Sequence, residues 1–171
     1  RFILLDLGIH VLDIARFLMG EVTDLCARTQ STMAITKADS AAAMSLRHAS
    51  GAVSEVVCSY TTRIDPDPFP QTLVEIEGSE GSLHLKLDYR LELHRPGRVE
   101  VTSVAPKTPA WADPEWAMVQ ESVLNTQAHF AACLLSGAEF QTSGRDNLRT
   151  FALVEAAYAS AASGQPVVPE A

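Results

Sequence analysis

The order of hydrophobic patterns along this 171-residue chain sets the strongest limit on its fold. Between residues 22 and 104, β-branched and alternating apolar residues recur between turn signals, which is typical of strands. Before and after this region, the apolar spacing becomes that of helices. Strands joined by short turns pair antiparallel. We therefore predict an α+β fold: a large, mostly antiparallel sheet with helices packed on one face and the other face available for oligomerisation.

About seven strands are expected, in the ranges 22–33, 41–49 and 52–62 and, for four shorter strands, within 72–104. Turns are predicted at Ser50-Gly51, 78–81 and 95–98, where glycine supplies backbone freedom. The segment 63–70 separates the two groups of strands. Its three prolines cannot donate the backbone hydrogen bonds of a sheet, so it is expected to be a loop over the surface or over a site.

Three helices are predicted. The first runs from Asp6 to Met19 and is followed by Gly20. The second spans 114–137, with proline in its first turn and glycine at its end, and the third spans 145–164 and also ends at glycine. These helices cover one side of the predicted sheet, which leaves an apolar face for a subunit interface.

Composition excludes several classes of partner. The net charge is −8 and the basic residues do not cluster, so neither nucleic acid nor an anionic membrane is an expected partner. Apolar stretches end before the roughly 18 residues that a membrane span needs, and no charged leader precedes one, so a cytoplasmic protein is expected. The three cysteines form no CxxC pair and are expected to be buried free thiols. Neither these cysteines nor His48, His84 and His94 have ligand spacing, so no metal site is expected.

The opening helix carries three titratable residues in an apolar segment. Asp6 and Asp13 lie four residues before and three after His10, so all three share one helical face. Buried polar groups lose hydration unless they are paired, so such a triplet indicates either a functional site or a local network. The structural alternative is a helix capped by Asp6, with His10 hydrogen-bonded in the core.

Three segments together resemble a known family. The segment LLDLGIHVLDIARFLMG (4–20) is similar to the DxGxH motif and helix that open the C-terminal domain of the glucose–fructose oxidoreductase and inositol dehydrogenase (Gfo/Idh/MocA) family. VEIEGSEGSLHL (74–85) resembles that family's strand–turn–strand, and the segment 129–169 resembles its closing helices and final strand. The resemblance covers nearly the whole chain.

The resemblance implies an NAD(P)-dependent dehydrogenase of a sugar, cyclitol or related polyol. Residues 1–171 would be its single C-terminal domain for substrate binding and oligomerisation, as a homodimer or homotetramer. By the same likeness, the catalytic residues would be His10, which accepts the hydroxyl proton, and Asp6, which binds a hydroxyl or orients His10. Imidazole is suited to proton transfer at neutral pH.

The chain lacks features of the family's cofactor domain. None of its nine glycines belongs to a GxG pair, and no lysine stands in a Glu-Lys-Pro motif. An N-terminal dinucleotide domain is therefore expected to be absent here, with NAD or NADP bound by the full-length parent and none by this chain, which would be inactive alone. The alternative is a non-catalytic sugar-binding or protein-association module of the same fold.

Further substrate-binding candidates are Asp13, Tyr60 and Arg63. Tyr60 and Arg63 lie where a predicted strand meets the proline-rich loop, and loops at strand ends commonly carry specificity. A core tyrosine and a solvated arginine are the structural alternatives for these two positions.

Overall fold

The computed structural model describes residues 1–65 and 71–170, except for the side chain of residue 115, and the chain divides into two compact units. The first unit combines residues 1–63 with 141–171, so the two ends of the chain belong together. The second unit comprises residues 64–140.

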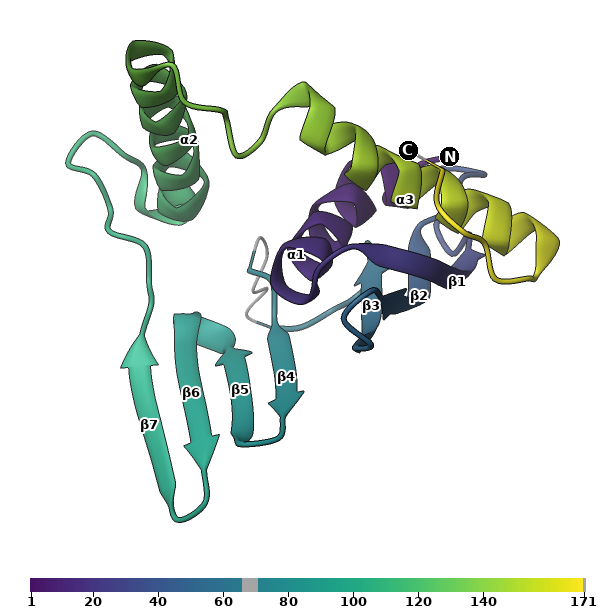
Figure 1. Cartoon of the computed structure of the whole chain (residues 1–171), viewed down its shortest axis with the longest axis horizontal. Helices are drawn as coiled ribbons and strands as arrows, with labels where there is room; N and C mark the ends of the chain where they lie inside the picture. Colours follow the sequence, from purple (N-terminus) through teal and green to yellow (C-terminus); the bar gives the residue numbers. More distant parts are fainter. Residues whose placement is uncertain (66–70, 171) are drawn as a thin grey trace. The chain divides into compact units, whose positions relative to one another are not determined.

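The first unit is a three-stranded sheet with two helices (Figure 1). Its strands pair antiparallel in the order β1-β2-β3, and its first helix continues from a π-helical turn. The bounds of these elements are Leu4–Gly8 for the π turn η1, Ile9–Met19 for α1, Val22–Gln30 for β1, Ala41–His48 for β2, Val53–Ser59 for β3 and Gly144–Ser163 for α3.

The hydrophobic core lies in this first unit. Alternate residues of the three strands are buried, as expected when one face of a sheet is covered. Helix α3 packs on β1, while α1 packs on α3 and β3. The largest apolar side chains in this core are fully buried: Ile3, Leu4, Leu12, Leu25, Met44, Leu46 and Val154.

A distant carboxylate caps the start of the first helix. Asp39 accepts hydrogen bonds from the backbone N–H groups of Phe2, at 2.9 Å, and Leu4, at 3.4 Å, and from the Tyr158 hydroxyl at 3.1 Å. Burial raises the pKa of Asp39, but these hydrogen bonds to its ionised form outweigh burial and hold it below the ordinary value. Helical structure therefore begins at Leu4 rather than at Asp6, which lies inside the π turn.

The second unit contains a four-stranded antiparallel sheet, in the order β4-β5-β6-β7, and a long helix. Its β5–β6 connection is the short helix η2, and a single turn η3 precedes the long helix. The bounds are Val74–Gly78 for β4, Gly81–Lys86 for β5, Leu87–Tyr89 for η2, Arg90–Arg95 for β6, Arg98–Ser103 for β7, Pro114–Trp116 for η3 and Ala117–Ser136 for α2.

The two faces of this four-stranded sheet differ in chemistry. Directly paired residues of an antiparallel sheet point to the same side. One side, called here the apolar face, carries Val74, Ile76, Leu83, Leu85, Leu91 and Leu93. The other, called the polar face, carries Glu75, Glu77, His84, Lys86, Arg90, Glu92 and His94. Leu83 and Leu93 are partners on the apolar face, as His84 and Glu92 are on the polar face.

The α+β class, the seven antiparallel strands and the predicted turns are confirmed. Gly51 and Gly97 have φ angles of 88° and 72°, which side chains rarely adopt and which their turns require. The strands form two sheets rather than one large sheet. The division falls at the segment 63–70, whose prolines cannot continue a ladder. Residues 66–70 of that predicted loop lie outside the described residues.

Two predictions from composition can also be checked. Within the described residues, no helix is both long and apolar enough to cross a membrane. The three cysteines are free: Cys58 and Cys133 are buried as predicted, while Cys26 is half-buried.

Candidate functional site

Asp6 is hydrogen-bonded to a tyrosine that directly follows strand β3. The Tyr60 hydroxyl, just after β3, donates a hydrogen bond to Oδ2 of Asp6 in the π turn. The Tyr60 ring lies 5.0 Å from the Phe2 ring, and its backbone N–H donates to the Ser40 carbonyl at 3.0 Å. Burial and then the Asp6 carboxylate raise the pKa of Tyr60 above its ordinary value, so the phenol keeps its proton and remains a donor.

Asp6 lies in a π turn that is closely packed at Gly8. A Cβ at Gly8 would lie 3.1 Å from Cδ2 of Leu4 and 3.3 Å from the carbonyl oxygen of Ile3, closer than most side chains tolerate. The absence of a side chain at Gly8 therefore allows the backbone between Asp6 and His10 to pack closely against Ile3 and Leu4. Such π turns occur frequently at functional sites.

His10 lies at the start of α1 and is exposed. No residue in the ranges 1–65 and 71–170 makes a hydrogen bond or ion pair with its ring. The alternative in which Asp6 caps the helix and His10 is satisfied in the core is therefore wrong, because Asp6 is inside the helical turn and His10 faces solvent.

Asp13 points toward α3 instead of toward His10. Its Oδ1 accepts a hydrogen bond from the Thr150 hydroxyl at 2.6 Å and lies 3.5 Å from the guanidinium of Arg16. Arg16 is 9% exposed and also pairs with Glu21 and Asp146, so this network joins α1 to α3. The hydrogen bonds and ion pairs of Asp6 and Asp13 thus go to residues other than His10, and the expected arrangement of an imidazole between two carboxylates is not observed. Substrate binding by Asp13 stays a prediction.

Arg63 is exposed at the end of the first unit. Its guanidinium makes none of the ion pairs or hydrogen bonds found among the described residues. An exposed cation with no partner among residues 1–65 and 71–170 is compatible with binding of a polar ligand, and that role also stays a prediction.

The described geometry supports acid–base chemistry at one surface. Asp6 and His10 lie on adjoining helical turns, the carboxylate is fixed by Tyr60 and the imidazole is open to solvent. A hydroxyl compound placed there could donate hydrogen bonds to a carboxylate and a proton to a ring nitrogen. No dinucleotide loop accompanies these residues, because the sequence has no GxG pair.

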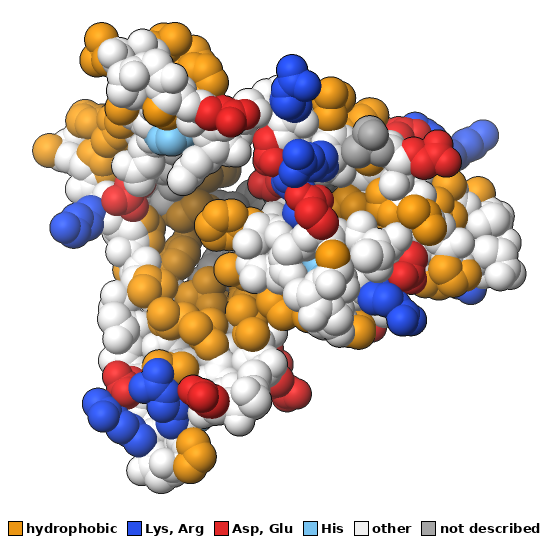
Figure 2. Space-filling model, in the orientation of Figure 1, with side chains coloured by type: hydrophobic (Ala, Val, Ile, Leu, Met, Phe, Trp, Pro, Cys, Tyr) orange, Lys and Arg blue, Asp and Glu red, His pale blue; other side chains and the backbone are white. Residues whose placement is uncertain are grey.

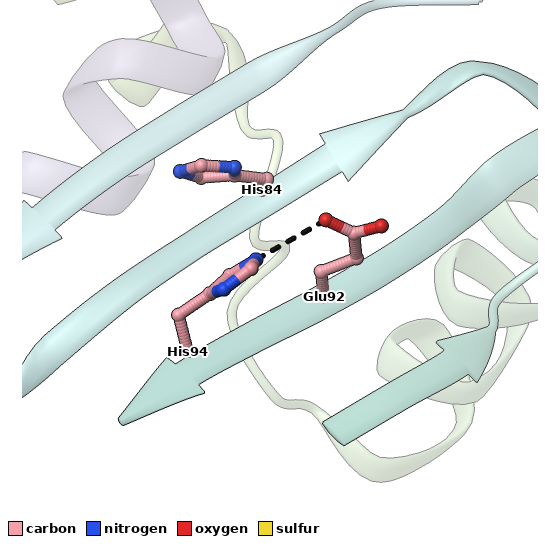
Figure 3. A group of neighbouring side chains, drawn as sticks. All are labelled: His84, Glu92 and His94. Atoms are coloured by element: carbon pink, nitrogen blue, oxygen red, sulfur yellow. Dashed lines mark hydrogen bonds and ion pairs between the residues drawn. The ribbon is translucent and has the colours of Figure 1, made fainter. Parts of the chain in front are cut away.

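A second polar cluster lies on the four-stranded sheet. His84, Glu92 and His94 come from β5 and β6 and stand on one face of the sheet (Figure 3). One ligand atom from each lies within 4.8 Å of the others. The expectation that His84 and His94 lack a ligand arrangement is therefore corrected: strand pairing, not sequence spacing, brings them together.

Comparison with known proteins identifies the family of the chain. The sequence profile of the GFO/IDH/MocA C-terminal domain matches residues 1–84. The D-apiose dehydrogenase of Paraburkholderia graminis is 52% identical over 167 residues, which cover 98% of this chain. The chain belongs to the GFO/IDH/MocA family. A second family member, the D-apiose dehydrogenase of Rhizobium rhizogenes, is 48% identical over 98% of the chain.

Solved GFO/IDH/MocA structures share the fold. An oxidoreductase from Agrobacterium radiobacter, crystallised with NAD⁺, L-tartaric acid and magnesium, superposes with a TM-score of 0.95 at 48% identity, covering 98% of this chain and 49% of that one. Levoglucosan dehydrogenase, at 20% identity and a TM-score of 0.73, shows the fold alone. The chain spans 44% and 48% of the lengths of the two D-apiose dehydrogenases.

Sequence reasoning missed the contacts that hold this GFO/IDH/MocA site. Tyr60 was a candidate for substrate binding, but its hydrogen bond to Asp6 spans 54 residues and has no local signal. Asp39 caps the site helix from a loop before β2 and had no predicted role. The cluster around Glu92 did have a signal, the alternate polar residues before and after Leu87–Tyr89, but no turn was predicted at that connection.

Proposed function

We propose that this chain is the substrate-binding and oligomerisation domain of a nicotinamide-dependent dehydrogenase that oxidises D-apiose or a closely related aldose. The observation that carries the proposal is 52% identity to a D-apiose dehydrogenase over 98% of this chain, including the region of the Asp6–His10 motif. The parent protein would be about twice as long as the chain, because the chain spans about half of its curated relatives.

His10 is the proton acceptor in this proposal. Oxidation of a sugar hydroxyl to a carbonyl removes a hydride from carbon and a proton from oxygen; bound NAD supplies the hydride acceptor. The exposed His10 ring takes the proton at a nitrogen that no described residue occupies. A positioned base of this kind contributes roughly 10²–10⁴-fold to a rate.

Asp6 positions the reacting sugar. Its Oδ2 accepts from Tyr60, which leaves Oδ1 to accept a hydrogen bond from a sugar hydroxyl. Charge-assisted hydrogen bonds of this kind are roughly twice as strong as neutral ones. Tyr60 therefore acts through Asp6, and Arg63 and Asp13 are candidates for further contacts with the sugar.

The residues of this chain do not fit a dinucleotide. Without a GxG loop they provide no backbone cradle for a pyrophosphate, so we assign NAD binding to a separate domain of the parent. The isolated chain should then bind no NADH in calorimetric titration. Tight binding of NADH by the isolated chain would contradict the assignment of NAD binding to a separate domain.

Oligomerisation is proposed through the apolar face of the four-stranded sheet. Hydrophobic side chains gather over this sheet in Figure 2, and the leucines, isoleucine and valine of its apolar face are only half-buried. A two-fold pairing of such faces buries them symmetrically. The assembly proposed through this face is a homodimer or homotetramer.

The function is tested by NADH formation in the parent protein. D-apiose should be oxidised with a kcat/KM at least tenfold above that for D-xylose, D-glucose and myo-inositol. Comparable rates for all four compounds would contradict an apiose-directed site. Absence of any sugar-dependent NADH formation would favour the non-catalytic module of the same fold.

A further inference from the structure

The second unit holds a buried carboxylate in an otherwise partly exposed sheet. Glu92 is 8% exposed, and it is the one residue of the described strands β4–β7 that is classed as buried. A buried carboxylate needs cationic or hydrogen-bonding partners. Oε1 of Glu92 lies 3.0 Å from Nε of Arg90, and Oε2 lies 2.9 Å from Nζ of Lys86 and 3.1 Å from Nε2 of His94.

These partners surround the Glu92 carboxylate with cationic and hydrogen-bond-donating groups from Lys86, Arg90 and His94. Lys86 and His94 are 42% and 37% exposed, so two partners of the carboxylate lie at the surface of the sheet. Lys86 has a long flexible side chain, which can move away when another cation takes its place.

His84 is the third member of the cluster. Its ring centroid lies 4.9 Å from that of His94, at an interplanar angle of 41°, and it is the strand partner of Glu92. Within the described parts of the chain, no residue hydrogen-bonds to either of its ring nitrogens. Figure 3 shows the three side chains standing together over β5 and β6.

The backbone beneath the cluster is fixed by close packing. A Cβ at Gly81 would overlap the carbonyl oxygen of His94, so only glycine lets the start of β5 approach β6 this closely. The pairs Ser82–His94 and His84–Glu92 then set the three ligand residues on one face. The ligand positions therefore belong to a regular sheet rather than to a loop.

We propose that His84, Glu92 and His94 form a binding site for a divalent transition-metal ion of the zinc class. Two imidazoles and one carboxylate are a ligand set that zinc accepts, with water at a fourth, open position. Imidazole nitrogens favour zinc, nickel or copper over magnesium, which prefers oxygen ligands. The ion would replace the Lys86 ammonium as the cation beside Glu92 and would tie β5 to β6.

The test is calorimetric titration of the whole chain, free of any polyhistidine tag, with ZnCl₂ at pH 7.5. Wild-type chain should bind one Zn²⁺, and titration with MgCl₂ should give no comparable binding. Zinc should also raise the melting temperature, because binding to the native state alone stabilises it. No zinc binding would overturn the proposal.

Four variants assign the ligands. His84→Ala and His94→Asn should each weaken zinc binding at least tenfold, and circular dichroism checks that both remain folded. Lys86→Met should strengthen binding, because it removes the competing ammonium and keeps the length of the side chain. His129→Ala, which removes a histidine near Cys133 on α2, is the matched control and should leave affinity unchanged.

Three results with these variants would contradict the proposed metal site. Binding that survives both His84→Ala and His94→Asn, or that is lost with His129→Ala, would place the ion elsewhere. A Lys86→Met chain that binds zinc more weakly than wild type would show that the cluster is an ion-pair network and not a metal site.

Discussion

At the scale of single residues, Tyr60 and Tyr158 form a natural matched pair. Each donates its hydroxyl to a carboxylate, Tyr60 to Asp6 in the candidate site and Tyr158 to Asp39 at the helix cap. Burial is the leading cause of a raised pKa for both phenols, and the pKa of Tyr158 reaches about 12. Both therefore stay protonated near neutral pH, but only the first contacts a proposed catalytic group.

The first prediction compares Tyr60→Phe with Tyr158→Phe in the parent protein. Tyr60→Phe keeps the ring beside Phe2 but frees Asp6, so kcat should fall about tenfold, the factor that corresponds to about 1.4 kcal/mol. Tyr158→Phe should leave kcat within about twofold and lower the free energy of unfolding by about 1 kcal/mol. Equal effects on kcat would mean that Tyr60 has only a structural role.

At the scale of elements, the start of the first helix depends on ionised Asp39. Because its folded-state pKa is lowered, Asp39 contributes stability that is fully present above its unfolded pKa of about 3.9 and is lost as the pH falls through the folded pKa. Asp39→Asn should therefore destabilise the chain by about 1–2 kcal/mol at pH 7. The difference from wild type should shrink below about pH 4.

Urea unfolding at pH 7 and pH 3 measures this pH dependence. Asp24→Asn is the control, because Asp24 pairs with Arg47, whose side chain is 70% exposed, and such surface pairs contribute little. A difference between wild type and Asp39→Asn that stays constant from pH 7 to pH 3 would contradict the cap.

The elements also show how far sequence reasoning reaches. Alternation and glycine turns predicted β1–β7 because those signals are local. The early start of the first helix could not be predicted, since its cap comes from Asp39, 37 residues from Phe2. Helical spacing predicted one shared face for Asp6, His10 and Asp13, but the contacts that Asp6 and Asp13 make, with Tyr60 and Thr150, depend on tertiary packing. The His84–Glu92 pair depends on strand register.

At the scale of the whole molecule, the account predicts self-association through the apolar face of the four-stranded sheet. Light scattering at micromolar concentration should give a mass of at least two chains, and stable interfaces of this kind bury upward of ~1,200 Å². Leu93→Lys places a charge on that face, beside its strand partner Leu83, and should give a monomer. Val101 is the strand partner of Glu92 on the polar face, and Val101→Lys should leave the mass unchanged. A monomeric wild-type chain would contradict the proposed interface.

The central claim is that His10 accepts the proton of the sugar hydroxyl, and turnover of His10→Ala in the parent protein tests it most directly. His10 is exposed and has no hydrogen bond or ion pair within the described residues, so its loss should not unfold the chain. The account predicts that kcat for sugar oxidation at saturating substrate falls by roughly 10²–10⁴, with NAD⁺ affinity unchanged. Turnover within a few-fold of wild type at neutral pH would contradict it.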